Sequence, residues 1–115
     1  MIYTIIIPHK LPGLNDYIGA CRAHRMAGAN MKKKTEELIA PYLDDLPPLE
    51  NPVTLHCHWI DGNGRRDIDN VAFAVKFILD ALQKSGKLPN DNRAHVKGIE
   101  HTFEVDKEKN HTVSS

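Results

Sequence analysis

The chain has 115 residues and a formal net charge of zero, with 41% hydrophobic and 26% charged side chains. This length and composition are typical of one globular domain with a core of modest size. They exclude a membrane-spanning helix, because no run of about 18 apolar residues occurs. The first residues lack the basic start of a signal peptide, and Cys21 and Cys57 have neither metal nor redox spacing. We therefore expect a cytoplasmic protein with reduced thiols.

The N-terminal third predicts a strand followed by helix. Residues 2–7 are β-branched or aromatic and end at Pro8, which favours a strand. Asn15 is a suitable N-cap for a helical region that extends to about Leu43. Glycines and an asparagine weaken the middle of this region, so two helical pieces broken near residues 28–30 are an alternative interpretation.

Residues 18–34 contain five basic residues and no acidic one, although the whole chain is neutral. A solvated helix face explains such a cluster, and so does a surface that binds phosphates. Three consecutive lysines at 32–34 cannot all point one way on a helix. We select Arg22, Arg25 and Lys33 as candidate phosphate contacts.

An acidic, proline-rich connector at residues 44–52 precedes a predicted half-buried strand at residues 53–60. Successive residues of this strand alternate between two faces. One face is apolar, with Val53, Leu55, Cys57 and Trp59, and the other is more polar, with Thr54, His56, His58 and Ile60. His56 and His58 share a face, as pairs of zinc ligands do. No third nitrogen or sulfur ligand is evident, which disfavours zinc.

A glycine-rich turn and a helix make residues 61–91 the stretch richest in candidate site residues. The helix is predicted from about Asp69 to Ser85, and Gly86 suits the position after its end. Its apolar residues recur at steps of three or four, which indicates one buried face: Ile68, Val71, Ala72, Val75, Ile78, Leu79 and Leu82.

Three carboxylates in this stretch are candidate ligands of a hard divalent cation. Asp67 and Asp69 lie at the start of the helix, and Asp91 lies in the turn after it. Mg²⁺ prefers such oxygen ligands together with waters and substrate phosphates. Lys76 follows Asp69 by seven residues, which places it about two turns further along nearly the same helix face. An ammonium there can reach a phosphate near the metal.

Two simpler explanations stay open for these residues. Aspartates at a helix start often serve only as caps, because their carboxylates accept hydrogen bonds from unpaired backbone N–H groups. Lys76 can form a surface ion pair with Asp80, four residues further on, worth a few tenths of a kcal/mol.

The C-terminal part predicts a strand over residues 94–105, with Gly98 as a bulge, then a turn at 106–110 and the start of a return strand at 111–113. The order of the elements predicts a single α+β domain over residues 1–115, with a small mixed sheet and two main helices.

The spaced residues resemble the signature of the RusA family of Holliday-junction resolvases. The matching positions are Asp67 to Asn70, Lys76 with Asp80 to Leu82, Gly86, and Asn90 with Asp91. The segment from Pro12 to Tyr17, with an arginine following, is similar to the N-terminal part of that family. The resemblance extends over about residues 4–105. Two positions depart from it, because the family's lysine is commonly placed where Phe73 stands here, and because Asn90 replaces an aspartate.

The resemblance implies a RusA-like fold and a structure-specific endodeoxyribonuclease of recombination and repair in a bacterial or phage-infected cell. It implies that Asp67, Asp69 and Asp91 bind Mg²⁺, with Mn²⁺ as a substitute, and that Lys76 is catalytic. It further implies a homodimer that cuts a four-way junction symmetrically. We add Arg66 to the expected DNA contacts. The alternatives are a non-catalytic DNA-binding or interaction module and a nuclease for other branched DNA such as flaps.

Overall fold

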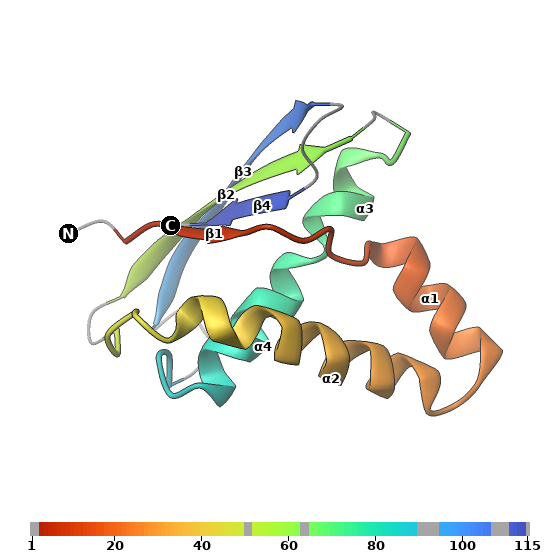
Figure 1. Cartoon of the computed structure of the whole chain (residues 1–115), viewed down its shortest axis with the longest axis horizontal. Helices are drawn as coiled ribbons and strands as arrows, with labels where there is room; N and C mark the ends of the chain where they lie inside the picture. The colour runs from red at the N-terminus through yellow and green to blue at the C-terminus, as the bar shows by residue number, and fades with distance from the viewer. Residues whose placement is uncertain (1–2, 50–51, 63–64, 90–94, 107–110, 115) are drawn as a thin grey trace.

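The sheet forms one layer of the protein. The computed structural model describes residues 3–49, 52–62, 65–89, 95–106 and the backbone of 111–114. Within these ranges, β1 (Ile5–Ile7), β2 (Val53–Asp61), β3 (Val96–Val105) and β4 (His111–Ser114) form a four-stranded sheet in the order β1-β4-β2-β3 (Figure 1). β2 and β3 run parallel, and β4 runs antiparallel to both of its neighbours. The predicted mixed sheet is therefore confirmed.

The helices form the second layer. They are α1 (Leu14–Ala23), α2 (Ala27–Ile39), the short 3₁₀ helix η1 (Ala40–Leu43), α3 (Ile68–Ala72) and α4 (Val75–Lys84). α2 and α4 lie side by side along one face of the sheet, and α1 extends to the side of them (Figure 1). This is a single α+β domain, as the order of the elements predicted. None of the described helices has the length and apolar character needed to cross a bilayer.

One core lies between the two layers. Its buried apolar side chains come from both sheet and helices: Ile7, Leu11, Ile39, Leu43, Leu46, Leu55, Cys57, Trp59, Val71, Ala74, Phe77, Ile78, Leu79, Ala81, Leu82, Leu88 and Val96. In β2, Leu55, Cys57 and Trp59 are buried, which confirms the predicted alternation. The opposite face of the sheet is not covered by the helices (Figure 1).

The region predicted as helix from residue 14 to 43 is two helices, and the break lies at residues 24–26 instead of 28–30. Gly28 does not break the chain. It is buried in α2 against α1, where an added Cβ would lie 2.4 Å from Cys21 Sγ. Glycine at this position therefore lets the two helices approach closely.

The helix predicted from Asp69 to Ser85 is also split, which corrects that prediction. α3 ends at Ala72 and α4 begins at Val75. Between them the backbone tightens, with hydrogen bonds of the i to i+3 type from the Ala74 N–H to Val71 O (3.2 Å) and from the Lys76 N–H to Phe73 O (3.0 Å).

The end of α4 agrees with its sequence pattern. Gly86 has a φ of 77°, a conformation that glycine adopts without steric cost. Its N–H donates to Gln83 O (3.1 Å), and the Lys87 N–H donates to Leu82 O (2.9 Å). These two bonds form a Schellman motif, so the predicted role of Gly86 is confirmed.

Two further local predictions have clear outcomes. The register of β2 and β3 shifts between Val53 and Thr54, which leaves Lys97 as an extra residue beside Gly98 and confirms the bulge. The N-cap of α1 is Gly13 instead of Asn15. The reason is that Asp16 reaches back to accept the Gly13 N–H at 2.9 Å, so the helix starts earlier.

Candidate metal and DNA-binding site

Asp67 and Asp69 lie together at the start of α3 with exposed side chains. Asp67 occupies the N-cap position in an extended conformation, but its carboxylate makes no capping hydrogen bond. Neither carboxylate is ion-paired or hydrogen-bonded to a described residue. An aspartate that serves only as a cap accepts hydrogen bonds from helix N–H groups through its carboxylate. The Asp67 carboxylate accepts none, so the structure does not support that explanation for Asp67.

The turn before these aspartates is fixed by Arg66. Its guanidinium donates to Asp61 Oδ1 at 2.6 Å and to the Leu11 carbonyl at 3.2 Å. Both members of the ion pair are largely buried, with side-chain exposures of 18% and 16%. Arg66 was predicted to contact DNA. The structure instead shows it joining the end of β2 to the loop before α1.

Asn70 fixes the aspartates from the other side. Its side chain is only 8% exposed, and its Oδ1 accepts the Asn15 N–H at 2.8 Å. The backbone at Gly13 approaches so closely that an added Cβ would lie 2.6 Å from Asn70 Oδ1 and 2.8 Å from Asn70 O. The start of α3 is therefore held tightly against the start of α1.

These contacts bring together two segments that are far apart in the sequence. Residues 11–15 contact residues 66–70 through the bonds of Arg66 and Asn70. Tyr17 extends the junction, because its ring packs against Phe73 and Phe77 with centroid separations of 5.6 and 6.2 Å. Tyr17 is therefore partly buried and packs against the hydrophobic core.

Lys76 lies in the first turn of α4 with an exposed side chain. Asp69 is on the other side of the helix break, so the two residues do not share a continuous helix face, and that part of the prediction is wrong. A 3₁₀ turn rotates the chain by about 20° more per residue than an α-helix does. Asp80 also does not pair with Lys76 as the alternative proposed, because its carboxylate faces Lys32 at 3.1 Å.

The third predicted metal ligand, Asp91, lies outside the described residues. Over the ranges that are described, no three His, Cys, Asp or Glu side chains gather closely enough to hold a metal ion. The structure therefore places two of the three predicted carboxylates, and these two are adjacent.

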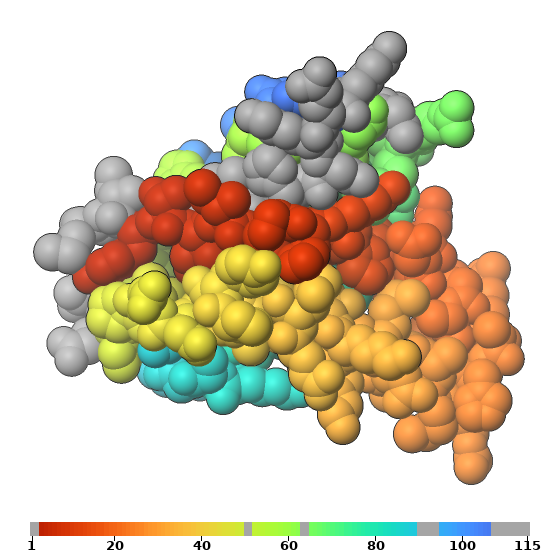
Figure 2. Space-filling model, viewed as in Figure 1, coloured from red at the N-terminus to blue at the C-terminus, as the bar shows by residue number. Residues whose placement is uncertain are grey.

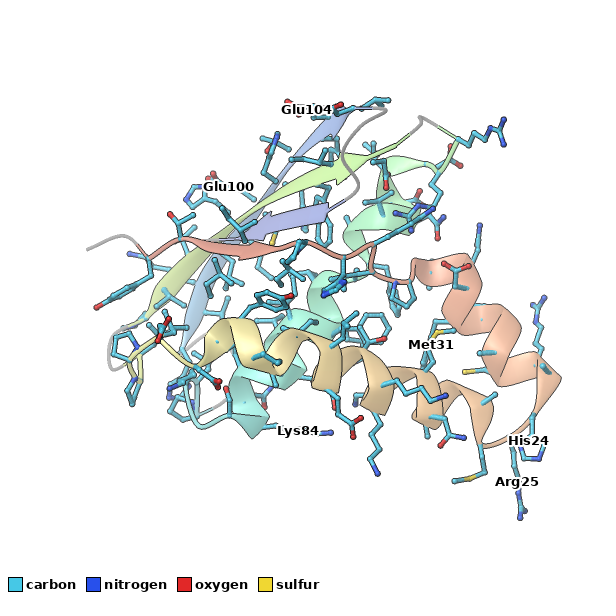
Figure 3. The ribbon with its side chains drawn as sticks, in the orientation of Figure 1. His24, Arg25, Met31, Lys84, Glu100 and Glu104 are labelled. Carbon is cyan, nitrogen blue, oxygen red and sulfur yellow. The ribbon has the colours of Figure 1, made fainter. Side chains whose placement is uncertain are left out.

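The three predicted phosphate contacts lie on the α1–α2 hairpin. Arg22, Arg25 and Lys33 are all exposed. Arg25 lies at the tip of the hairpin beside His24 (Figure 3), and the hairpin forms one corner of the molecule (Figure 2). Since α1 has 10 residues, it extends about 15 Å from the aspartates towards this tip.

Lys32 differs from the other residues of the basic cluster because it forms an ion pair with another helix. Its ammonium contacts the Asp80 carboxylate of α4. The hydrogen bond and charge of Asp80 raise the pKa of Lys32 above its ordinary 10.5. This agrees with the expectation that the three lysines point in different directions.

The uncovered face of the sheet has a different character. His56 Nδ1 lies 2.8 Å from Glu100, and His58 contacts Thr102 Oγ1 at 2.6 Å and Glu104 at 3.7 Å. Glu100 and Glu104 extend from β3 on the side away from the helices (Figure 3). These acidic and histidine side chains pair with one another, and the described residues offer no zinc site there.

Sequence reasoning missed the two residues that hold the site in place. Arg66 was assigned to DNA and Asn70 only to a motif, whereas Arg66 binds the loop before α1 and Asn70 binds the first turn of α1. One signal of this packing was present in the sequence. Gly13 lies in the motif from Pro12 to Tyr17, which contains Asn15, and a glycine often marks a place where two backbone segments approach closely. The contacts of Arg66 with Leu11 and of Asn70 with Asn15 each span 55 residues, beyond the reach of local patterns.

No protein-family model matches the chain, and no curated protein matches it.

Proposed function

We propose that this protein is a Mg²⁺-dependent endodeoxyribonuclease that resolves four-way DNA junctions by paired, symmetric cleavage. The observation that carries the proposal is the pair of exposed carboxylates of Asp67 and Asp69, neither paired with any described residue, at the tightly held start of α3. The resemblance of residues 12–17, 67–70 and 76–91 to RusA-type resolvases supplies the reaction, and two of those segments are in contact here.

The donor chemistry of this site fits Mg²⁺. Two adjacent carboxylates that repel each other are stabilised by a cation between them, and Mg²⁺ typically takes one or two carboxylates plus waters and phosphate oxygens. Asp67 and Asp69 would hold the ion, with Asp91 as the third expected ligand. When bound, Mg²⁺ neutralises charge on a phosphodiester and lowers the pKa of a coordinated water.

The chain's own residues then have defined tasks in phosphodiester hydrolysis. Asn70 and Arg66 keep the two aspartates in a fixed position, which avoids the cost of ordering the site when DNA binds. Lys76 supplies an exposed positive charge for a non-bridging phosphate oxygen, where negative charge increases during the reaction. In the reaction, the oxygen of water bonds to phosphorus and the P–O bond to one sugar breaks.

DNA approaches the site from the side of the α1–α2 hairpin. Arg22, Arg25 and Lys33 contact backbone phosphates along about 15 Å from the aspartates, a distance of roughly four base steps at 3.4 Å each. The uncovered sheet face, with Glu100 and Glu104, points away from the DNA. A homodimer provides two such sites for the two matched strands of a junction.

The decisive experiment is cleavage of a labelled synthetic four-way junction, with linear duplex and flap DNA as controls. Wild-type protein is expected to make paired nicks with Mg²⁺, and Asp69→Asn is expected to cleave at least about 100-fold more slowly while still binding the junction. Asp45→Asn is the matched control, because Asp45 is also exposed but lies in the connector after η1. It should cleave as wild type does.

Mg²⁺ binding is checked independently by thermal unfolding of the protein without DNA. At a Mg²⁺ concentration of about 100 Kd, wild type gains roughly 2.7 kcal/mol, and Asp69→Asn gains little. Preferential cleavage of flaps would redirect the proposal to another branched substrate. Junction binding without nicks, in Mg²⁺ or Mn²⁺, would contradict it and favour a non-catalytic binding module.

A further inference from the structure

β3 is an open edge of the described sheet. It pairs with β2 on one side, and no described strand lies on the other side. The strand is 10 residues long, and a long open edge presents a row of backbone donors and acceptors that a further strand can satisfy.

An apolar stripe follows this edge on the helix side of the sheet. The register places Ile99 opposite Leu55 and Phe103 opposite Trp59, so these side chains share the core-facing side. The core does not cover them, however, because Ile99, Phe103 and Val105 are 40%, 37% and 57% exposed. Exposed apolar side chains on one side of one strand mark a surface that another chain can cover.

Trp59, His101 and Phe103 form a row of stacked rings along this stripe. The Trp59 indole N–H donates to His101 Nδ1 at 2.8 Å, and the ring of His101 stacks on Trp59 and on Phe103 with centroid separations of 6.0 and 6.2 Å. Burial lowers the pKa of His101, which favours the neutral form of its ring. The row fixes Phe103, and a rigid aromatic ring loses little entropy when it is buried in an interface.

The usual protections of an edge strand occur only at its beginning. Lys97 and the bulge beside it disturb pairing there. From Ile99 to Val105, the helix side of the strand carries no charged residue. The charges of this segment, Glu100 and Glu104, lie on the other face, where they face His56 and His58.

We propose that β3 pairs with β3 of a second copy of this chain, antiparallel across a two-fold axis, to form one continuous sheet. Charge distinguishes the three registers that are centred on residues 100, 101 and 102. With Thr102 opposite itself, Glu100 faces Glu104 of the other copy, and with Glu100 opposite itself, two carboxylates meet. With His101 opposite itself, Glu100 faces Thr102, and Ile99 packs on Phe103 in both halves of the interface.

The use of this dimer rests on the proposed function, because a two-fold axis supplies the two active sites that paired cleavage needs. The interface itself is testable without DNA. A wild type that dimerises but does not cut junctions contradicts the proposed function alone. A wild type that cuts junctions as a monomer contradicts the interface alone.

Sedimentation equilibrium measures the association. Wild type is expected to have twice the chain mass of 13.0 kDa at micromolar concentration. Ile99→Lys should raise the dimer Kd at least about 100-fold, because each interface contains the new charge twice. Ile6→Lys is the matched control, since Ile6 is also exposed (57%) but lies on β1 at the opposite edge. Circular dichroism confirms that both variants are folded.

A cysteine cross-link tests the register. In a Cys21→Ser background, His101→Cys should form an intermolecular disulfide on mild oxidation, because directly opposed residues have Cα atoms about 4.5–5.5 Å apart. Thr102→Cys should not. A cross-link at 102 but not at 101 overturns the register. A monomeric wild type, or an Ile99→Lys protein that dimerises as tightly as Ile6→Lys, overturns the interface.

Discussion

At the scale of single residues, the candidate site depends on two close contacts. The Asn70 side chain lies against the Gly13 backbone and accepts the Asn15 N–H. A side chain larger than hydrogen at position 13 meets both the backbone and the amide of Asn70, neither of which can move away easily. The glycine is therefore required by the geometry of the site and not by a special backbone conformation.

Gly13→Ala is expected to destabilise the fold by about 1–3 kcal/mol, because the added methyl group forces α1 away from α3. Gly19→Ala in the same helix should be neutral or stabilising by up to about 1 kcal/mol, since nothing lies within 4 Å of its added Cβ. Urea unfolding of both variants measures the difference. Equal stability of the two would show that the contact with Asn70 relaxes without cost.

At the scale of elements, α2 and α4 are joined by two ion pairs as well as by the core. Lys32 pairs with Asp80, and Lys84 pairs with Glu36, whose side chain is buried. Asp80 and Lys84 are one turn apart on α4, and Lys32 and Glu36 are one turn apart on α2. The pairs therefore fix the lengthwise position of the two helices, which the apolar contacts alone specify less sharply.

The Lys32–Asp80 pair predicts a change of stability at high pH. Asp80 raises the pKa of Lys32 in the folded state above 10.5, so the stabilisation is complete below about pH 10 and is lost as pH rises through the raised value. Lys32→Met should lack this part of the pH dependence. Because Lys32 is partly exposed, the substitution should lower the free energy of unfolding at pH 7 by less than about 1 kcal/mol. Urea unfolding at several pH values, with Lys33→Met as control, tests it. Identical pH profiles for wild type and Lys32→Met would disprove the linkage.

At the scale of the whole molecule, charge is segregated despite a net charge of zero. Exposed basic residues gather on the α1–α2 hairpin, and Glu100 and Glu104 lie on the uncovered sheet face (Figure 3). A neutral total therefore does not argue against a nucleic-acid ligand. The segregation of charge instead indicates which side of the protein would contact such a ligand.

Removing hairpin charges should weaken junction binding and reduce its salt dependence. Each lost phosphate contact lowers the slope of log K against log salt by roughly 0.9. Arg22→Ala, Arg25→Ala and Lys33→Ala are therefore each expected to lower the slope by about one, whereas Lys97→Ala on β3 should leave it unchanged. Fluorescence anisotropy between low and moderate salt measures the slopes. Unchanged slopes for all three hairpin variants would place the DNA on another surface.

Local sequence signals were sufficient to predict several of the elements. The alternation of β2, the glycine at the end of α4 and the order of strands and helices each arise within a few residues, and the structure confirms them. The adjacency of Asp67 and Asp69 was equally local, since only Ile68 separates them.

The way in which these elements meet depends on long-range packing. Both predicted long helices are split. The apolar pattern continues from Ile68 to Leu82, although i to i+3 hydrogen bonds at residues 71–76 divide that segment into α3 and α4. Arg66 contacts Leu11, Asn70 contacts Asn15, and Asp80 contacts Lys32, and each of these contacts joins residues 48 or more positions apart. Contacts over such separations depend on how the chain folds back on itself, which periodicity and spacing do not encode.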